Sequence, residues 1–171
     1  MSASSPIIRQ INAKEAEIVA GILMEAAGWL DGRGMSMWRD NELQSERIAA
    51  DAEAGLIFLA ETGGQPAGTL KFQLEDLLFW PEMTQPDSAY IHRLAVRRQF
   101  AGGNVSSALM RWAAERTRGL GRRYLRLDCE AARARLRAVY ERFGFRHHSD
   151  RQVGPYFVSR YEYDVVEGLN S

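Results

Sequence analysis

A glycine-bearing turn in the middle of the chain constrains the fold most. The turn spans residues 99–104 and reads Gln-Phe-Ala-Gly-Gly-Asn. Before it, residues 90–96 alternate and are rich in strand formers, and after it Val105, Leu109 and Trp112 recur at helical spacing. A strand that turns directly into a helix leaves the backbone N–H groups of the first helical turn without partners. Because the helix dipole adds partial positive charge there and glycines allow close approach, the turn predicts a phosphate-binding site.

The composition predicts one globular domain. A chain of 171 residues is long enough for one core and short for two. No apolar run approaches the length of a membrane span, and the first six residues lack the basic and apolar regions of a secretory signal. Cys129 is the only cysteine, so the chain can form no internal disulfide and no thiolate cluster for zinc. We therefore expect a cytoplasmic protein without a membrane partner.

The net charge of zero conceals a strong segregation of charge along the chain. Residues 93–146 contain 14 arginines against four acidic residues, whereas residues 1–92 carry an acidic excess. This asymmetry suggests that the basic half handles an anion; the alternative is that many of these arginines lie on solvated helix faces. Nucleic-acid binding is a weaker interpretation, because the arginines lack interleaved exposed aromatic residues and fall partly inside predicted strands. We expect no nucleic-acid partner.

Periodicity and turn residues predict a mixed α/β domain with the order β-α-α-β-β-β-α-β-α-β-β. Asn12, with Glu15 three residues later, has the pattern of a capping box before the first helix. Gly144 is expected to end the last helix. The expected strands are 6–11, 56–61, 67–74, 90–96, 124–129, 145–148 and 156–165. The expected helices are 16–23, a second one from Ser36 or Asn41 to about Gly55, 105–118 and 131–142, with a break at 28–34 and a loop at 75–88.

Two motifs in this order resemble the GCN5-related N-acetyltransferase (GNAT) family. The family signature Gln/Arg-x-x-Gly-x-Gly/Ala stands at 99–104, and a Tyr followed by Gly-Phe stands at Tyr140, Gly144 and Phe145, with one strand between the motifs. The resemblance covers nearly the whole chain. It implies a single GNAT-like domain over residues 6–166 after a flexible N-terminus at 1–5. The implied architecture is a central mixed, mostly antiparallel sheet flanked by about four helices.

The same resemblance implies acetyl-CoA as co-substrate and no metal. Backbone groups of Leu94, Ala95 and Val96 would pair with the pantetheine arm, and amides of the glycine turn would hold the pyrophosphate. The implied coenzyme-binding residues of the turn are Gln99, Gly102, Gly103, Asn104, Val105 and Ser106. Asn104 departs from the family's Gly or Ala, and Arg133 stands where the family often carries an Asn that contacts the pantetheine arm. An Arg at that position is long enough to reach a phosphate instead.

Attack of an amine on a thioester requires a base for the ammonium and an acid for the leaving thiolate. Tyr140 is the acid that the resemblance implies; the alternative is a core tyrosine. His92 is the candidate base, because the strand 90–96 is similar to the corresponding strand of arylalkylamine N-acetyltransferases, where a histidine serves this step. A structural histidine is the alternative, and Glu75 and Asp76 are fallback carboxylates.

In the family the first two helices and their connection usually build the acceptor site. Trp29, Trp38 and Glu42 lie there, and aromatic rings beside carboxylates suit a cationic amine with apolar bulk. The alternative is that the tryptophans cover the core. The loop 77–88, with Trp80, is expected to form an opposite wall or a subunit contact. His147 and His148 point to opposite faces of their strand and are expected at the surface rather than on a metal.

The sequence therefore predicts an N-acetyltransferase that moves an acetyl group from acetyl-CoA to a primary amine. The acceptor is a small molecule or a peptide, and the attack is direct within a ternary complex. The alternative is a GNAT-like module that binds acyl-CoA without turnover. A homodimer is left open, because the terminal strand 156–165 is expected to be exposed.

Overall fold

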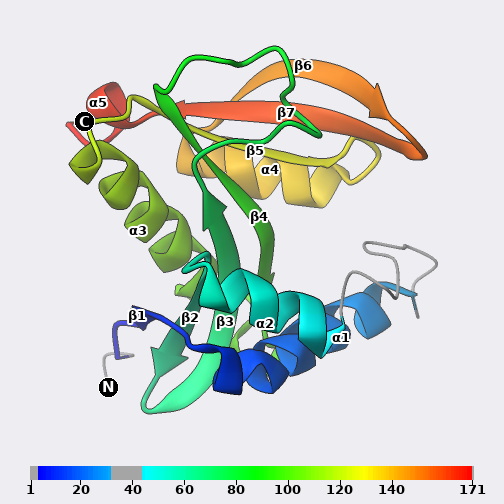
Figure 1. Ribbon diagram of the computed structural model, residues 1–171, viewed down its shortest axis with the longest axis vertical. Coiled ribbons are helices and arrows are strands. Elements are labelled where there is room, and N and C mark those ends of the chain that lie inside the picture. The colour runs from blue at the N-terminus through cyan, green and yellow to red at the C-terminus, as the bar shows by residue number, and fades with distance from the viewer. Residues whose placement is uncertain (1–3, 32–43, 171) are drawn as a thin grey trace. The chain divides into compact units, whose positions relative to one another are not determined.

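The computed structural model describes residues 4–31 and 44–170, and their helices and strands occur in the predicted order (Figure 1). The strands are β1 (Ile7–Gln10), β2 (Ile57–Thr62), β3 (Gln65–Gln73), β4 (Ser88–Val96), β5 (Tyr124–Glu130), β6 (Arg146–Val153) and β7 (Tyr156–Asp164). The α-helices are α1 (Ala16–Asp31), α2 (Ser45–Glu53), α3 (Val105–Gly119), α4 (Ala134–Phe143) and α5 (Val165–Gly168), and two short 3₁₀ helices are η1 (Ala13–Glu15) and η3 (Arg98–Phe100). None of the helices in these ranges is long and apolar enough to cross a membrane.

The strands form one mixed sheet with the order β1-β2-β3-β4-β5-β7-β6. The ladders of β1 with β2, β2 with β3, β5 with β7 and β6 with β7 are antiparallel, and that of β4 with β5 is parallel. The mixed, mostly antiparallel sheet that the sequence predicts is therefore confirmed. Strand β7 lies between β5 and β6, and the sheet ends at β6. The expectation that the strand at 156–165 is an exposed edge is thus wrong, because the hairpin places β6 outside it.

The described chain divides into two compact units that interleave along the sequence. The first comprises Met1–Lys71 and Arg93–Met110, and the second Phe72–His92 and Arg111–Ser171. In the first unit, α1 packs against α2 (Figure 1). The fully buried side chains of its core include Ile11, Ile22, Leu23, Ile48 and Leu59.

In the second unit, α4 packs beside the sheet through a group of aromatic rings. Tyr140 on α4 meets Tyr161 on β7 with ring centroids 6.2 Å apart, and Phe143 meets Tyr163 at 5.2 Å. These tyrosines are buried, together with Leu125 of β5. Alternate residues of β5 and β7 therefore face α4, and the residues between them face the other side of the sheet.

Several predicted boundaries moved. Helix α1 continues through Gly28 to Asp31, because a glycine within a helix costs only about 1 kcal/mol and Ala27 beside it is buried. Helix α2 starts at Ser45, later than predicted, after extended backbone at Gln44. Strand β6 extends to Val153 because it pairs with β7 from Glu162 back to Tyr156. The capping box is confirmed, since the Glu15 carboxylate accepts from the Asn12 backbone N–H and the Asn12 side chain accepts from Lys14.

Candidate active site

His92 and Asp128 occupy equivalent positions on two parallel strands of the second unit. The ladder between β4 and β5 pairs Ser88 with Tyr124 and, as its last pair, Tyr90 with Arg126. Because side chains alternate along a strand, the residues two positions further on, His92 and Asp128, emerge on the same face just past the end of this ladder.

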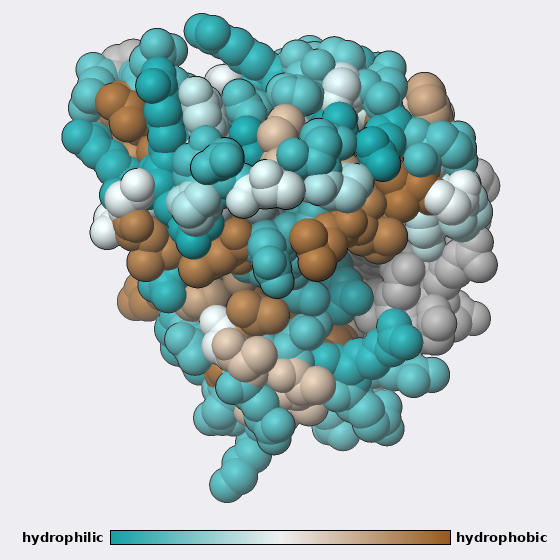
Figure 2. All heavy atoms as spheres, turned by 45° about the horizontal axis from the view of Figure 1, so that its top comes forward, coloured by the Kyte–Doolittle hydropathy of each residue, from teal (hydrophilic) through white to brown (hydrophobic). Residues whose placement is uncertain are grey.

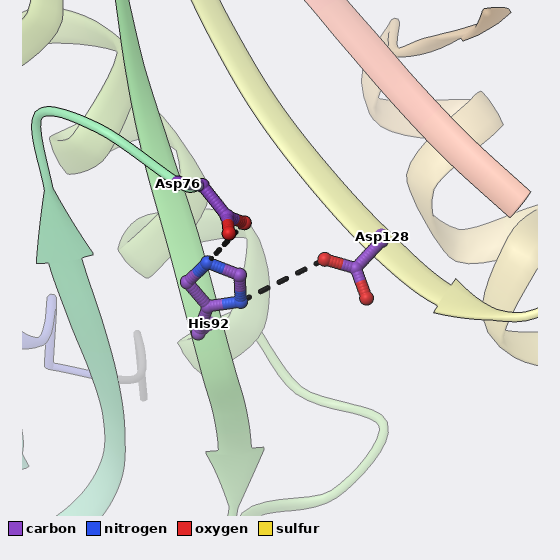
Figure 3. Close-up of side chains that lie close together, drawn as sticks. All are labelled: Asp76, His92 and Asp128. Atoms are coloured by element: carbon purple, nitrogen blue, oxygen red, sulfur yellow. Dashed lines mark ion pairs between the residues drawn. The ribbon is translucent and has the colours of Figure 1, made fainter. Parts of the chain in front are cut away.

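The His92 ring lies between two carboxylates (Figure 3). Its Nε2 lies 2.8 Å from Oδ2 of Asp76, and its Nδ1 lies 3.7 Å from Oδ1 of Asp128. The first contact has the length of a hydrogen bond, although its direction departs from ideal hydrogen-bond geometry. The three side chains are only 18%, 4% and 10% exposed for His92, Asp76 and Asp128, respectively. The candidate base is therefore partly shielded from water and has a different acidic neighbour at each ring nitrogen.

The loop between β3 and β4 fixes Asp76. Its Oδ1 accepts hydrogen bonds from the backbone N–H groups of Leu78 at 3.2 Å and Phe79 at 2.9 Å. Its backbone carbonyl accepts from the N–H of Trp80 at 3.0 Å. With Oδ1 held by the loop, Oδ2 is the oxygen that faces His92.

Trp80 anchors this loop to the sheet. Its side chain is 1% exposed, and its ring contacts two guanidinium groups, with Cζ of Arg160 4.5 Å and Cζ of Arg126 5.2 Å from the ring centroid. Arg126 also pairs with Glu162, and Arg160 with Glu82. Trp80 itself is therefore a buried anchor of its own unit, whereas the expectation that the loop 77–88 forms an opposite wall or a subunit contact stays a prediction.

The loop exposes aliphatic side chains instead. Leu77 is 70% exposed and Leu78 is 63% exposed. Figure 2 shows that apolar side chains gather in patches on the face that it displays. In the described part of the second unit, the large exposed apolar side chains are Leu74, Leu77, Leu78, Leu120, Phe157 and Val166.

The two carboxylates beside His92 differ in acidity. Burial tends to raise the pKa of Asp76, but the imidazole of His92 and two loop amides outweigh it and hold this pKa below its ordinary value. Burial raises the pKa of Asp128 to about 6, and the charge of Asp76 adds to the rise, whereas His92 opposes it. At neutral pH Asp76 is therefore firmly ionised, while Asp128 titrates close to neutrality.

Tyr140 is a protonated phenol inside the second unit. It is 5% exposed, and burial raises the pKa of its hydroxyl well above the ordinary value, with a further rise from Cys129. Among the described residues its hydroxyl has no hydrogen-bond partner, whereas the hydroxyl of neighbouring Tyr161 donates to Glu141. Tyr140 is thus packed in the core like a structural residue, and its hydroxyl proton is not engaged in a hydrogen bond, as a proton donor requires.

The glycine turn of the first unit has the expected strand–turn–helix form. Gly102 has φ +78°, in the left-handed region that favours glycine. Asn104 occupies the N-cap position of α3, because its carbonyl accepts the first helical bond from the N–H of Ala108 at 3.0 Å. Within the described chain, the backbone N–H groups of residues 104–107 have no acceptor. The departure at Asn104 therefore leaves the helix start intact, with four amides free for an anion.

The other predicted coenzyme residues in the first unit lie around this turn. Leu94, Ala95 and Val96 form the end of β4, with Ala95 buried. Gln99 lies in η3, where its side chain meets that of Gln65 at 3.4 Å. Arg93, immediately after His92, has φ +52°, an uncommon conformation for a residue with a side chain. Such backbone strain is frequent next to functional residues.

Arg133 lies in the second unit, at the N-cap position of α4. Its positive charge tends to lower the pKa of both Tyr140 and Cys129. It is therefore close to the candidate acid, whereas its contact with the coenzyme stays a prediction.

The predicted acceptor residues fall largely outside the described part of the chain. Trp29 belongs to α1, but its side chain is not among those described, and Trp38 and Glu42 lie outside the described residues. Their role stays a prediction.

The remaining titratable candidates are accounted for. Burial raises the pKa of Cys129 to about 12, so it is not an activated thiol. His147 pairs with Asp150 at 2.8 Å, whereas the ring of His148 lies 5.2 Å from that of Trp80, so the two histidine rings have different neighbours, as predicted. One ligand atom from each of Asp76, His92 and Asp128 lies within 4.8 Å of the others. The two ring nitrogens of His92 face different carboxylates, and the absence of a metal stays a prediction.

A separate groove of about 650 Å³ also lies in the second unit. Its lining includes Tyr124, Arg146, Glu162 and Tyr163. None of the predicted site residues lines it.

Sequence reasoning ranked Asp76 only as a fallback and missed Asp128. The available signal was alternation: in the strand 124–130, Asp128 is out of phase with Leu125, Leu127 and Cys129, which are buried. An acidic residue on the strand face opposite the apolar residues is usually expected to be exposed to solvent. Only the pairing of β4 with β5 brings it to His92.

Comparison with known proteins gives the family. The model of the Acetyltransferase (GNAT) family matches residues 23–145. The chain belongs to this family. A GNAT enzyme transfers an acetyl group from acetyl-CoA, and this chain is accordingly an acetyl-CoA-dependent N-acetyltransferase.

Its relatives agree. The chain is 28% identical over 140 residues, 77% of either protein, to the N-acetyltransferase YesJ of Bacillus subtilis, whose own name calls it uncharacterized. A GNAT acetyltransferase structure from Listeria monocytogenes is 22% identical, with a TM-score of 0.79 over 96% of this chain and 98% of that one. The PaiA N-acetyltransferase of Thermoplasma acidophilum, solved with coenzyme A, is 14% identical, with a TM-score of 0.70 over 93% and 99%. At such identities the solved neighbours establish the fold.

Proposed function

We propose that this GNAT enzyme acetylates a primary amine, on a small molecule or a peptide, by direct attack on acetyl-CoA within a ternary complex. The observation that carries the proposal is the His92 ring, held by Asp76 at one nitrogen with the other nitrogen directed to Asp128. An imidazole that keeps a lone pair on one ring nitrogen can accept a proton from a substrate.

Two groups of the second unit handle protons in this proposal. His92 takes a proton from the ammonium group, which frees the nitrogen lone pair. The nitrogen attacks the thioester carbonyl, so that a C–N bond forms and the C–S bond breaks. Tyr140 donates its proton to the departing thiolate and regains one as the acylated nitrogen loses its second proton. The proton on His92 then returns to solvent.

In the first unit, the turn would hold the coenzyme. The four free amides before and within the first turn of α3 suit a diphosphate, and two solved structures with this fold contain coenzyme A or acetyl-CoA. We assign this role to Gly102, Gly103, Asn104, Val105 and Ser106, with Gln99 beside them. Leu94, Ala95 and Val96 are proposed to pair with the pantetheine arm, and Arg133 to reach a phosphate. Trp29, Trp38 and Glu42 stay proposed for the acceptor.

Thiol release from acetyl-CoA tests the function. The purified protein is offered a panel of alkylamines, arylalkylamines, polyamines, aminoglycosides and peptides, and free coenzyme A is measured with a thiol reagent. Amine-dependent release supports the enzyme. Coenzyme binding without release for any amine favours the module without turnover.

The variant Tyr140→Phe tests the acid. We expect kcat to fall by roughly 10²–10⁴-fold with little change in coenzyme Kd, because only the proton donor is removed. Tyr161→Phe is the matched control, since Tyr161 is an equally buried tyrosine whose hydroxyl is bonded to Arg137 and Glu141. Equal losses in both variants would reduce Tyr140 to a packing residue.

A further inference from the structure

The carboxylate of Asp128 in the second unit is buried without an evident structural reason. Its side chain is nine-tenths buried, and among the described residues its Oδ1 has no hydrogen-bond partner. A buried carboxylate oxygen without a donor is costly, because burial removes the water that would otherwise solvate it. Nδ1 of His92 lies 3.7 Å away from this oxygen, too far for a direct hydrogen bond. A donor from outside the protein would satisfy this oxygen.

Asp76 determines which ring nitrogen of His92 carries the proton. An ionised carboxylate accepts only, so Oδ2 of Asp76 at 2.8 Å favours a proton on Nε2. In the neutral ring the lone pair then lies on Nδ1, the nitrogen directed to Asp128. The lone pair of the base and the orphaned oxygen therefore lie 3.7 Å apart, so that one donor nitrogen placed beside both atoms could contact each of them.

The geometry points to an ammonium subsite: we propose that Asp128 binds the protonated nitrogen of a cationic acceptor amine while Nδ1 of His92 takes its proton. Asp76 is a positioning residue that keeps the other ring proton on Nε2. The inference rests on the proposed function and narrows its substrate class to amines that arrive as ammonium ions. The N–H bond of the ammonium breaks, its proton moves to Nδ1, and the lone pair stays on the amine nitrogen.

The charges around the pair fit a cation. Asp76 supplies a firmly ionised carboxylate from the loop, and Asp128 supplies a second one from β5. The facing cation from β7 is Arg160, which is already bonded to Glu82 and Ser149. From α4, Tyr140 is close enough for Asp128 to raise its pKa. A protonated amine would therefore offset a local excess of negative charge.

The tautomer of His92 is the first test. In the coenzyme-free protein, ¹⁵N NMR of the ring distinguishes a protonated nitrogen from one with a lone pair, and we expect Nε2 protonated and Nδ1 free. In Asp76→Asn, the two backbone amides that bind Oδ1 retain the side-chain oxygen, so the NH₂ group faces Nε2. It can only donate, and we expect the tautomer to reverse. A proton on Nδ1 in the wild type would overturn the proposal.

The Asp128→Asn variant provides the second test. Loss of its negative charge should lower the protonated fraction of the His92 ring at a fixed pH, read from the same ¹⁵N spectrum. The exposed pair of His147 and Asp150 is the matched control: Asp150→Asn should alter the His147 signals and leave those of His92 unchanged. An unchanged protonated fraction of His92 in Asp128→Asn would also overturn the proposal. These measurements need no acceptor, so they stand even if no amine in the panel is acetylated.

Kinetics with any amine that the panel identifies complete the test. Asp128→Asn should raise the KM for the amine about tenfold or more, leave the Kd of acetyl-CoA unchanged, and shift the acid limb of the kcat/KM profile. Asp76→Asn should mainly lower kcat. If Asp128→Asn stays active and its amine KM and the acid limb of its kcat/KM profile are unchanged, the subsite is ruled out. The acetyltransferase function would not be affected by that result.

Discussion

At the scale of single residues, burial of Asp128 couples the proposed chemistry to the free energy of unfolding. Its folded pKa of about 6 lies above the ordinary value of 3.8 because the carboxylate is desolvated. A group whose folded pKa is raised contributes stability that is complete below the unfolded pKa and is lost as pH rises through the folded pKa. The stability contributed by Asp128 is therefore lost between about pH 4 and pH 6–7.

We predict that Asp128→Asn stabilises the protein above this window. The amide carries no charge that burial would penalise, so at pH 8 the free energy of unfolding should rise by roughly 1–3 kcal/mol relative to the wild type. Near pH 4 the difference should nearly vanish. Urea unfolding at several pH values measures it. Asp150→Asn serves as the exposed control, and a destabilised Asp128→Asn at pH 8 would contradict the prediction.

At the scale of elements, the turn before α3 depends on a glycine in the left-handed region. Gly102 has φ +78° and open space around its Cα. Alanine there meets no neighbour but costs roughly 1–2 kcal/mol of backbone strain. If the turn relaxes, its free amides no longer converge on one anion.

We therefore predict that Gly102→Ala weakens coenzyme A binding by about tenfold, measured by calorimetric titration. Gly64→Ala is the matched control, because Gly64 has φ +80°, also has open space, and lies in the β2–β3 turn. It should lose similar stability but keep its coenzyme affinity. Similar losses of affinity in both variants would show that the effect is not specific to the turn.

A second glycine controls how closely β3 and β4 approach α3 within the first unit. A Cβ on Gly68 would lie 2.9 Å from the backbone oxygen of Ala95 and 3.0 Å from Cγ1 of Val105. The backbone oxygen cannot rotate away as a side chain can. The close approach thus places the end of β4 directly beside the start of α3.

We predict that Gly68→Ala lowers the free energy of unfolding by roughly 1–3 kcal/mol through overpacking. Gly28→Ala, in α1 with nothing within 4 Å of the new methyl group, should instead stabilise the protein by roughly 0.5–1 kcal/mol. Thermal unfolding of the two variants compares them directly. If both variants changed the free energy of unfolding in the same direction, the packing argument would be refuted.

At the scale of the whole molecule, coenzyme binding should appear as thermal stabilisation. A ligand at 100 times its Kd adds about 2.7 kcal/mol to the native state. For a chain of this size that corresponds to a rise in Tm of about 5–10 °C. We predict such a rise with coenzyme A, measured by differential scanning calorimetry, and none with duplex DNA of equal phosphate concentration. Stabilisation by DNA alone would favour a nucleic-acid role for the arginine-rich half.

Local sequence patterns by themselves determined the secondary structure and the order of the elements. The glycine turn at 99–104, the capping box at Asn12 and the order of elements all follow from interactions between residues close in sequence, which is why the sequence predicts them. The resemblance carried by the turn and by Tyr140 also gave the family. The strand that contains His92 made it the candidate base, and this role stays a prediction.

Tertiary structure alone decided the surroundings of His92. Asp76 and Asp128 lie 16 and 36 residues from it in the chain, and only strand pairing and the loop that Trp80 anchors bring them to opposite ring nitrogens. The order of the last strands was likewise decided by pairing, which put β6 outside β7. Such contacts depend on strand register and burial between residues far apart in the sequence. The type of a residue alone does not indicate which neighbours will pack against it and exclude water from it.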